Sequence, residues 1–359
     1  GNFWYLSGIE YPDWRVVIDG TRGRTWLIAP DVDDVHQVFD GSLDHSTAKR
    51  ICGADEVLDR TAGDRLLRDL ALKHSVVYTL NDPPYAEYFD FALNPAPRKL
   101  REELSRIFTT TRDCQKELAE LRAIKQPTEV LAIKKAVKLT TDTFQRIHDH
   151  LSDFHTEYEI EAEFSYIFRR NGARGHAYDP IVAGGHNACT LHYVANHDRL
   201  RKGQMVLIDI GARYGGYAAD VTRTYALGEP SKRAQEIHSA TRAAQAEIVK
   251  LLGPDVSVTE YQVGVDRIMK RTLYDLGLTK DPDDDVAYRH YMPHSVSHGL
   301  GVDVHDRLGA PHVFQAGMVL TVEPGIYVPE KSIGVRIEDD ILITENGVQN
   351  LSSSLSTAW

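Results

Sequence analysis

The sequence of 359 residues predicts an α/β (α+β) fold divided into two domains. The chain is longer than one ordinary hydrophobic core supports, so we expect two cores. In the first third, short apolar runs typical of strands alternate with amphipathic runs typical of helices, which favours a sheet covered by helices. Further along, two apolar segments each enter a turn containing glycine or proline and leave it again, as hairpins do. We place the first domain at residues 1–120 and the second at 121–359.

The elements of the first domain follow from the periodicity of its apolar residues. Strands are expected at 15–19, 25–29 and 75–80, and helices at about 58–72 and 98–108. The aromatic segment at 1–8 is expected to be strand-like.

Two long amphipathic helices are expected in the second domain. After Gln126 and Pro127, Thr128 can cap a helix that continues through Phe144, because its apolar residues keep helical spacing. A second helix, at about 231–252, carries its apolar residues on one stripe. Both patterns indicate helices with one buried face.

The first predicted hairpin brings two aspartates together. Asp209 ends a buried apolar run, and Asp220 follows a turn that contains glycine. The midpoint between them is Tyr214-Gly215, so a two-residue turn there would place the two carboxylates directly across from each other. Cross-strand Cβ atoms lie about 4.5–5.5 Å apart, and the ions of paired metal sites about 3.5–4 Å apart. This spacing suits two carboxylates that share a metal pair.

The second predicted hairpin contributes two glutamates in the same way. Its centre falls at Glu330-Lys331, which places Glu323 opposite Glu338. Arg336 lies two residues before Glu338 and therefore on the same face of the strand. A guanidinium there can orient carboxylates that bind metal, or bind the carboxylate of a substrate with two hydrogen bonds.

These four carboxylates and the imidazole of His298, which stands in a glycine-rich segment, form a candidate ligand set. A buried unpaired carboxylate is costly, and two facing carboxylates repel each other, so a bound cation would stabilise the arrangement. Oxygen donors suit hard divalent cations, whereas a set without thiolates disfavours a structural zinc.

Several segments that carry these residues match the motifs of one known family. They are Asp209-Ile-Gly-Ala, Asp220-Val-Thr-Arg-Thr, Ser297-His298-Gly-Leu-Gly-Val-Asp-Val-His305-Asp, Thr321-Val-Glu323-Pro-Gly-Ile-Tyr, Val335-Arg336-Ile-Glu338-Asp-Asp and Asn187-Ala-Cys189-Thr-Leu-His192-Tyr. In order and spacing the chain resembles the Xaa-Pro peptidases, prolidase and aminopeptidase P, across about residues 120–350. The segment Asn2-Phe-Trp-Tyr5-Leu-Ser-Gly8 resembles a further family stretch.

The resemblance implies a creatinase-like N-terminal α/β domain followed by a pita-bread catalytic domain. We expect further residues of the N-terminal domain, a strand and a helix, upstream of Gly1. The resemblance also implies two divalent metal ions, with Mn²⁺ favoured and Co²⁺ or Zn²⁺ as alternatives, and a homodimer. The implied metal ligands are Asp209, Asp220, His298, Glu323 and Glu338.

The same resemblance implies roles in the hydrolysis of Xaa-Pro bonds by a hydroxide that bridges the two metals. Glu323 matches the general base. His192 and His305 match histidines that contact the substrate and the tetrahedral intermediate, and His294 matches a histidine beside the pocket. Arg336 is expected to orient ligands or bind substrate.

Composition excludes other classes of protein. A net charge of −11 without a basic cluster argues against a nucleic-acid partner. No stretch reaches the roughly 20 apolar residues of a membrane span, and no signal peptide is visible. The three cysteines are odd in number and far apart, which fits a reducing compartment, and we expect a cytoplasmic protein.

The expected substrate is an Xaa-Pro dipeptide, as for a prolidase, because Arg307, His312 and Arg336 could bind its carboxylate. The alternative is an Xaa-Pro aminopeptidase that acts on longer peptides. One departure from the family motif keeps this alternative open, because His312 stands where the family usually has an arginine. A methionine aminopeptidase and a non-catalytic pita-bread binding protein remain as further readings, and the filled ligand positions disfavour the second of these.

Overall fold

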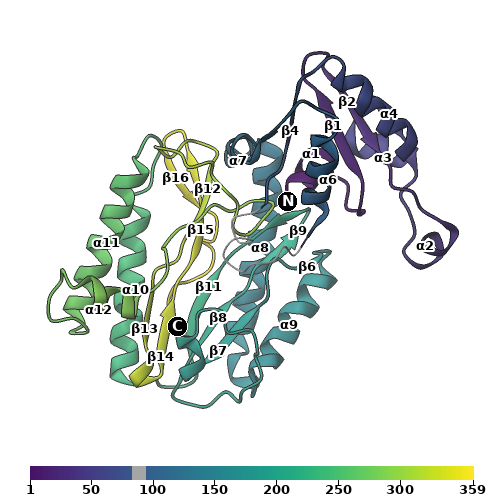
Figure 1. Cartoon of the computed structure of the whole chain (residues 1–359). Coiled ribbons are helices and arrows are strands. Elements are labelled where there is room, and N and C mark those ends of the chain that lie inside the picture. The colour runs from purple at the N-terminus through teal and green to yellow at the C-terminus, as the bar shows by residue number, and fades with distance from the viewer. Residues whose placement is uncertain (83–93) are drawn as a thin grey trace. The chain divides into compact units, whose positions relative to one another are not determined.

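The computed structural model describes residues 1–82 and 94–359 (Figure 1). It divides into two compact units, Gly1–Leu118 and Ala119–Trp359. The division falls within helix α7 (Gln115–Ala123). Among the described residues, no helix is both long enough and apolar enough to span a lipid bilayer.

The first unit contains two small sheets and several helices, most of which contact the strands. In one sheet β1 is antiparallel to β2 and β2 is parallel to β3; in the other β4 and β5 are parallel. The strands are β1 (Arg15–Asp19), β2 (Arg24–Ile28), β3 (Glu56–Leu58), β4 (Val76–Thr79) and β5 (Thr110–Asp113). The helices are α1 (Asn2–Ser7), α2 (Asp34–Phe39), α3 (His45–Cys52), α4 (Arg60–Ala71) and α6 (Ala96–Ser105).

One prediction for this unit is wrong. Residues 2–7 form helix α1 rather than a strand. Gly8 ends the helix with a φ of 68°, and its N–H donates to the carbonyl oxygen of Trp4 at 2.6 Å. A glycine that closes a helix in this way overrides the weak strand preference of aromatic residues.

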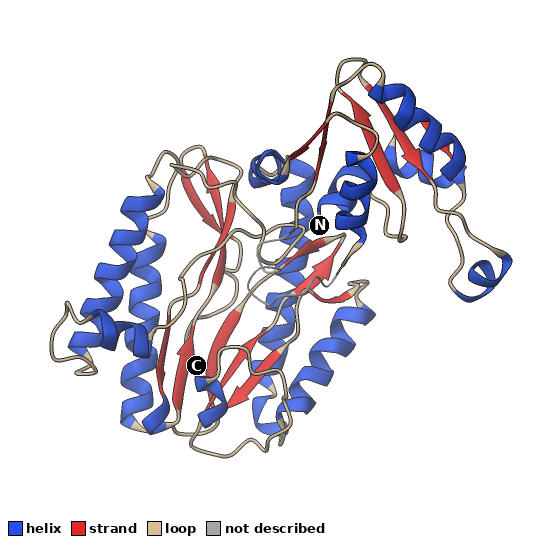
Figure 2. Cartoon of the chain, viewed as in Figure 1, coloured by secondary structure: helices blue, strands red, loops and turns tan. Residues whose placement is uncertain are grey.

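In the second unit, helices flank the strands on two sides (Figure 2). α8 and α9 pack with β7, β8 and β11 around one apolar core, and α10 and α11 pack with β12 to β15 around another. The helices are α8 (Pro127–Asp149), α9 (Glu157–Arg170), α10 (Lys232–Val249), α11 (Val258–Asp275) and α12 (Asp285–Tyr291), with short 3-10 turns η1 (Leu151–Asp153), η2 (Gly185–Cys189) and η3 (Pro329–Lys331). The strands are β6 (Gly175–His176), β7 (Ile181–Gly184), β8 (Met205–Asp209), β9 (Ala212–Tyr214), β10 (Tyr217–Ala218), β11 (Thr222–Ala226), β12 (Val319–Val322), β13 (Gly325–Val328), β14 (Ile333–Arg336), β15 (Asp339–Thr344) and β16 (Gly347–Asn350).

The N-cap of the long helix α8 lies two residues before Thr128, the cap that the sequence predicts. Gln126 is the N-cap, and its side chain and that of Glu129 form a reciprocal capping box, with Pro127 at the first helical position. Proline is favoured there because its missing N–H has no helical partner to lose. Thr128 therefore lies inside the helix.

The register of the first hairpin differs from the prediction. Asp209 pairs with Thr222, and Tyr214 pairs with Tyr217. The turn is thus Gly215-Gly216, with φ of 57° and 84°, rather than Tyr214-Gly215. A tight hairpin turn of this kind needs two positive φ values, which glycine adopts without strain. Asp220 consequently lies just before β11 and is not directly opposite Asp209.

The register of the second hairpin agrees with the prediction. Gly325 pairs with Arg336 in the β13–β14 ladder, and Val322 pairs with Asp339 in the β12–β15 ladder. Both pairs are centred on Glu330-Lys331, within η3. Glu323 and Glu338 occupy the facing gap between the two ladders.

Candidate metal centre

The predicted site residues come from separate strand ends and converge on one cavity of about 650 Å³ in the second unit. Asp209 ends β8, Asp220 precedes β11, and Glu323 and Glu338 stand between the paired strands of the second hairpin. His298 lies in the glycine-rich segment before β12. The remaining predicted residues that line the same cavity are His192, His294, His305 and Arg336.

Three of the predicted ligands lie close enough to share one ion. Suitable ligand atoms of Asp220, His298 and Glu338 all lie within 4.8 Å of one another. The Nε2 atom of His298 is also 3.4 Å from an oxygen of Asp220 and 3.4 Å from an oxygen of Glu323. Asp209 lines the cavity but is not a member of the three-residue group.

The imidazole of His298 is oriented for coordination. Its Nδ1 atom is 3.0 Å from the carbonyl oxygen of Gly299, to which it can only donate. The neutral ring then has its lone pair on Nε2, the atom that faces the acids. Histidine ligands commonly have their second nitrogen fixed in this way.

Three acids of the site, Asp220, Glu323 and Glu338, have raised pKa values because they are buried and because they repel one another. Burial raises the pKa of Glu323 to about 8, although His298 opposes the shift. Burial and the neighbouring carboxylates raise the pKa of Glu338 well above its usual range, and burial raises that of Asp220. Burial lowers the pKa of His298, but the carboxylates of Asp220 and Glu323 outweigh it and raise the value to about 9. The cluster thus has a deficit of positive charge.

Arg336 supplies part of that charge and joins the ligands to the cavity wall. Its buried guanidinium donates to Asp209 through Nη2, to the Tyr327 hydroxyl at 2.8 Å through Nη1, and to the Thr222 hydroxyl at 3.3 Å through Nε. Every nitrogen of the guanidinium therefore has a protein partner. The other oxygen of Asp209 accepts a hydrogen bond of 2.6 Å from Tyr178.

His294 is held on the far side of Tyr327. Its Nδ1 atom is 2.8 Å from the carbonyl oxygen of Ser295, so this nitrogen donates, and Nε2 accepts from the Tyr327 hydroxyl at 2.8 Å. Burial and Arg336 lower the pKa of His294 to about 4, which is consistent with a neutral ring. Both nitrogens are thus engaged within the protein.

His305 packs against His298, with ring centroids 4.4 Å apart and planes at 83°. The next residue, Asp306, is buried and pairs with Arg122 at 2.8 Å and with Lys125 at 3.5 Å. A Cβ at Gly301 would stand 2.0 Å from the Asp306 carboxylate, so only glycine fits there. The ion pairs fix the segment that carries both histidines.

Three residues that contact the site were not predicted from the sequence. Thr222 donates to Glu338 at 2.6 Å, Tyr178 donates to Asp209, and Asp306 anchors the histidine segment. The alternation of Asp220 and Thr222 at the start of a strand is a signal that could have identified Thr222.

The donor set fits hard divalent cations. It offers four carboxylates and one correctly oriented imidazole, and no cysteine is among the described residues that line the cavity. Burial and neighbouring carboxylates raise the pKa of three of these acids, and bound cations would favour their ionised forms.

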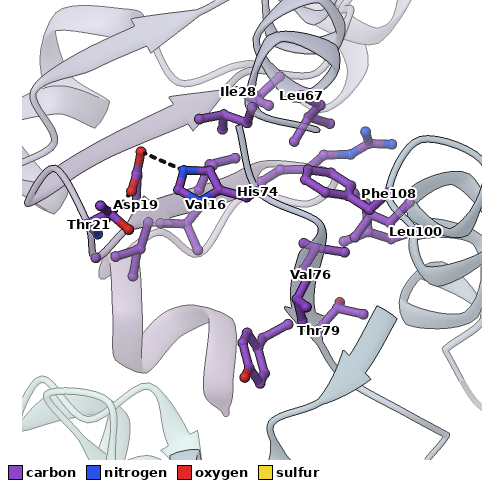
Figure 3. A pocket seen from close by; sticks show the side chains of 18 residues that line it. Val16, Asp19, Thr21, Ile28, Leu67, His74, Val76, Thr79, Leu100 and Phe108 are labelled. Atoms are coloured by element: carbon purple, nitrogen blue, oxygen red, sulfur yellow. Dashed lines mark hydrogen bonds and ion pairs between the residues drawn. The ribbon is translucent and has the colours of Figure 1, made fainter. Parts of the chain in front are cut away.

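The first unit has a cavity of its own, of about 510 Å³ (Figure 3). Its walls are mainly apolar side chains such as Val16, Leu67 and Phe108, and its main polar feature is the pair Asp19–His74, whose closest atoms are 3.4 Å apart. In the described part of the chain, three or more metal-binding side chains come within reach of one another only in the second unit. The candidate metal centre therefore lies in the second unit.

Comparison with known proteins supports both units. Residues 132–345 match the model of metallopeptidase family M24, and residues 1–78 match the aminopeptidase P N-terminal domain. The Xaa-Pro aminopeptidase of Escherichia coli K12 is 35% identical over 379 residues, which cover 99% of this chain and 85% of the relative. The Xaa-Pro dipeptidase of Pyrococcus furiosus is 34% identical but matches 66% of this chain and 65% of its own length.

Solved structures give the same result. The low-pH form of E. coli aminopeptidase P superposes with a TM-score of 0.84 at 32% identity, covering 99% of this chain and 86% of that one. A putative aminopeptidase P from Bacillus anthracis superposes with a TM-score of 0.86 at 28% identity, covering 99% and 85%. The fold implied by the motifs, a creatinase-like N-terminal domain followed by a pita-bread catalytic domain, is confirmed. With a family model over more than half of its length and full-length relatives above 30% identity, the chain belongs to metallopeptidase family M24.

Proposed function

We propose that this protein is a metal-dependent Xaa-Pro aminopeptidase, which removes the first residue of peptides that have proline in second place. The observation that carries the proposal is the convergence of five metal-binding side chains on one cavity. The class of substrate follows from the relatives. Aminopeptidases match this chain over 99% of its length, whereas the dipeptidase matches 66%. These findings favour the alternative of the sequence analysis over a prolidase.

The surroundings of Arg336 also argue against a dipeptidase. A dipeptidase needs a cation for the carboxylate of its substrate, and Arg336 already directs three of its five N–H donors to Asp209, Tyr327 and Thr222. Two other residues could bind a substrate carboxylate, Arg307 and His312, but neither is among the described residues that line the cavity. A longer peptide, which has a neutral amide after proline, makes no demand for such a cation.

We assign the two divalent ions to Asp209, Asp220, His298, Glu323 and Glu338. Mn²⁺ suits this oxygen-rich set best, with Co²⁺ or Zn²⁺ as alternatives. When bound, the ions polarise the scissile carbonyl and acidify the attacking water.

The side chains of this protein supply the remaining chemistry. Glu323, on the cavity wall, takes the proton of the attacking water and transfers it to the proline nitrogen as the bond breaks. His192 and His305 face the same cavity and donate to the oxygen that gains charge in the transition state. His294, with both nitrogens engaged, acts by holding Tyr327 and, through it, Arg336.

Selectivity for proline has a simple physical basis. An Xaa-Pro bond has no N–H, so a pocket cannot recognise it through that donor. The shape of the cavity around the ring must therefore discriminate, and we assign this role to the apolar side chains Ile181, Leu191 and Val194, which line it.

The test is turnover of Ala-Pro, Ala-Pro-Ala and a longer Ala-Pro peptide by one Mn²⁺-loaded preparation. We expect the longer peptides to give the higher kcat/KM. Faster hydrolysis of Ala-Pro would restore the prolidase reading, and no cleavage of any of the three would refute Xaa-Pro hydrolysis. Glu323→Gln serves as the control, with its metal content measured, and should turn over about 10²–10⁴-fold more slowly.

Two further properties belong to this proposal. A homodimer is expected by resemblance to the family, and light scattering that gave the 40.3 kDa of one chain would contradict it. A cytoplasmic location fits the three cysteines, which are all free. Fractionation of the source cells would test it.

A further inference from the structure

The segment that carries His192 has little regular structure of its own. It runs from η2 to residue 198 without a strand, and His192 stands in a turn with its side chain exposed. Its imidazole makes no hydrogen bond with any part of the chain that the structure describes. The position of His192 at the cavity must therefore be fixed through the backbone and side chains around it.

Glu157, the first residue of α9, provides that anchor. Its side chain is fully buried, and each carboxylate oxygen accepts two hydrogen bonds. One oxygen accepts from the amide N–H of Gly184 at 2.8 Å and from the side chain of Asn187 at 3.0 Å. The other accepts from the hydroxyl of Tyr193 at 2.8 Å and from the amide N–H of Asp198 at 2.9 Å. The donors lie at both ends of the segment and beside His192.

The arrangement requires a carboxylate rather than any polar group. All four partners donate to Glu157, so an amide at position 157 would turn its NH₂ group toward two of them, and only the Tyr193 hydroxyl could accept in return. At least one donor would therefore lose its acceptor beside a fully buried side chain, which is destabilising. The first turn of a helix also favours a negative charge, which stabilises Glu157 although no ion pair joins it to a cationic side chain within residues 1–82 and 94–359.

The backbone of Glu157 also binds the end of the segment, independently of its side chain. The amide N–H of Glu157 donates to the carbonyl oxygen of Asp198 at 3.0 Å. Asn187 donates to the Asp198 side chain at 2.8 Å as well as to Glu157. One helix terminus thus joins the beginning and the end of the segment, with His192 in the middle.

We propose that Glu157 is a positioning residue for His192, which fixes the segment of residues 185–198 so that the imidazole reaches the substrate. The inference rests on the proposed function only in assigning His192 to the substrate. Glu157 touches neither substrate nor metal and acts through the segment.

The kinetic test is a double-mutant cycle. In the Mn²⁺-loaded enzyme, Glu157→Gln should lower kcat/KM for Ala-Pro-Ala about 10–100-fold, because a small misplacement of a catalytic group costs about that much. In the His192→Ala background the same change should lower it less than about twofold. Glu159→Gln is the matched control: Glu159 lies in the same helical turn and accepts from the amides of His155 and Thr156, away from His192. It should leave kcat/KM unchanged.

A second measurement does not depend on activity. Hydrogen exchange of the segment 185–198 should be faster in Glu157→Gln than in the unchanged protein, while exchange of the segment around His305 stays the same. Tyr193→Phe, which removes one of the four donors and keeps the ring, should give a smaller change in the same direction and covers the case in which Glu157→Gln does not fold.

The outcomes separate the two proposals. Unchanged exchange in both variants would overturn the anchoring role, whatever the substrate. Equal losses of kcat/KM with and without His192 would show that Glu157 supports the fold and does not act through His192. Absence of Xaa-Pro cleavage in the unchanged protein, together with faster exchange in the variants, would refute the function and the link to catalysis but retain the anchor.

Discussion

Replacing Arg336 by lysine tests how the site holds its ligands. The change keeps the positive charge but removes the fork that reaches Asp209, Tyr327 and Thr222 at once. A single ammonium on a flexible chain can retain Asp209 and must release Tyr327. Asp209 would then keep its charge partner but lose its fixed orientation.

The magnitude follows from the contacts that are lost. The hydrogen bond to Tyr327 involves a charged donor, and such bonds contribute about 1.5–3 kcal/mol. That energy corresponds to about a 10–100-fold change in an equilibrium constant, which is also the typical effect of removing a group that orients a metal ligand. We therefore expect Arg336→Lys to weaken Mn²⁺ binding about 10–100-fold.

The assay is calorimetric titration of the chelator-treated protein with Mn²⁺, followed by kcat/KM at saturating metal. Tyr327→Phe, which removes the same hydrogen bond and leaves the guanidinium, should show an intermediate effect. Arg267→Lys, an exposed arginine on α11, is the matched control and should be unchanged. Full metal affinity and activity in Arg336→Lys would refute the view that the forked geometry orients Asp209.

Three more predictions concern the second unit. Chelation should abolish turnover and lower Tm, because the buried carboxylates then repel one another; full activity in a sample shown to be metal-free would contradict it. Asp306→Asn should destabilise the protein by about 3 kcal/mol in urea denaturation, because Arg122 and Lys125 lose a buried partner; an unchanged midpoint would show that the pairs are dispensable. Burial holds the pKa of His238 at about 4, below its ordinary 6.5, so protonation opposes folding. Stability should be complete above pH 6.5 and fall by up to about 3 kcal/mol toward pH 4, and His238→Gln at the same metal concentration should flatten that slope.

Much of the metal centre could be predicted from the sequence because strands impose a simple rule. Side chains alternate with period two, so a carboxylate at a known distance from a turn has a calculable partner. This was sufficient for Glu323 and Glu338, whose register is as predicted. For the first hairpin the predicted turn was wrong by one position. Both Tyr214-Gly215 and Gly215-Gly216 could form the turn, and the chain uses Gly215-Gly216 because both residues have a positive φ, which glycine adopts without strain.

The parts that sequence could not supply are contacts between distant segments. Glu157 is separated by 35 positions from His192 and reads as an ordinary acidic residue in the first turn of a helix. Asp306 belongs to a recognisable motif, but its partner Lys125 lies 181 positions away in the sequence. Local propensity carries no information on such pairs, because burial and charge compensation depend on the packed chain.

Hydrogen bonds from neighbouring residues determine which atoms of the ligand side chains are free to coordinate a metal ion. Nδ1 of His298 donates to Gly299 and leaves Nε2 toward the cavity. One oxygen of Glu338 accepts from Thr222, which leaves the other oxygen without that constraint. Both oxygens of Asp209 accept, from Tyr178 and Arg336, yet each carboxylate oxygen has a second lone pair and can still coordinate. The orientation of the site is thus set before any ion binds, so a variant that alters Thr222, Tyr178 or Arg336 should change metal affinity while every ligand is still present.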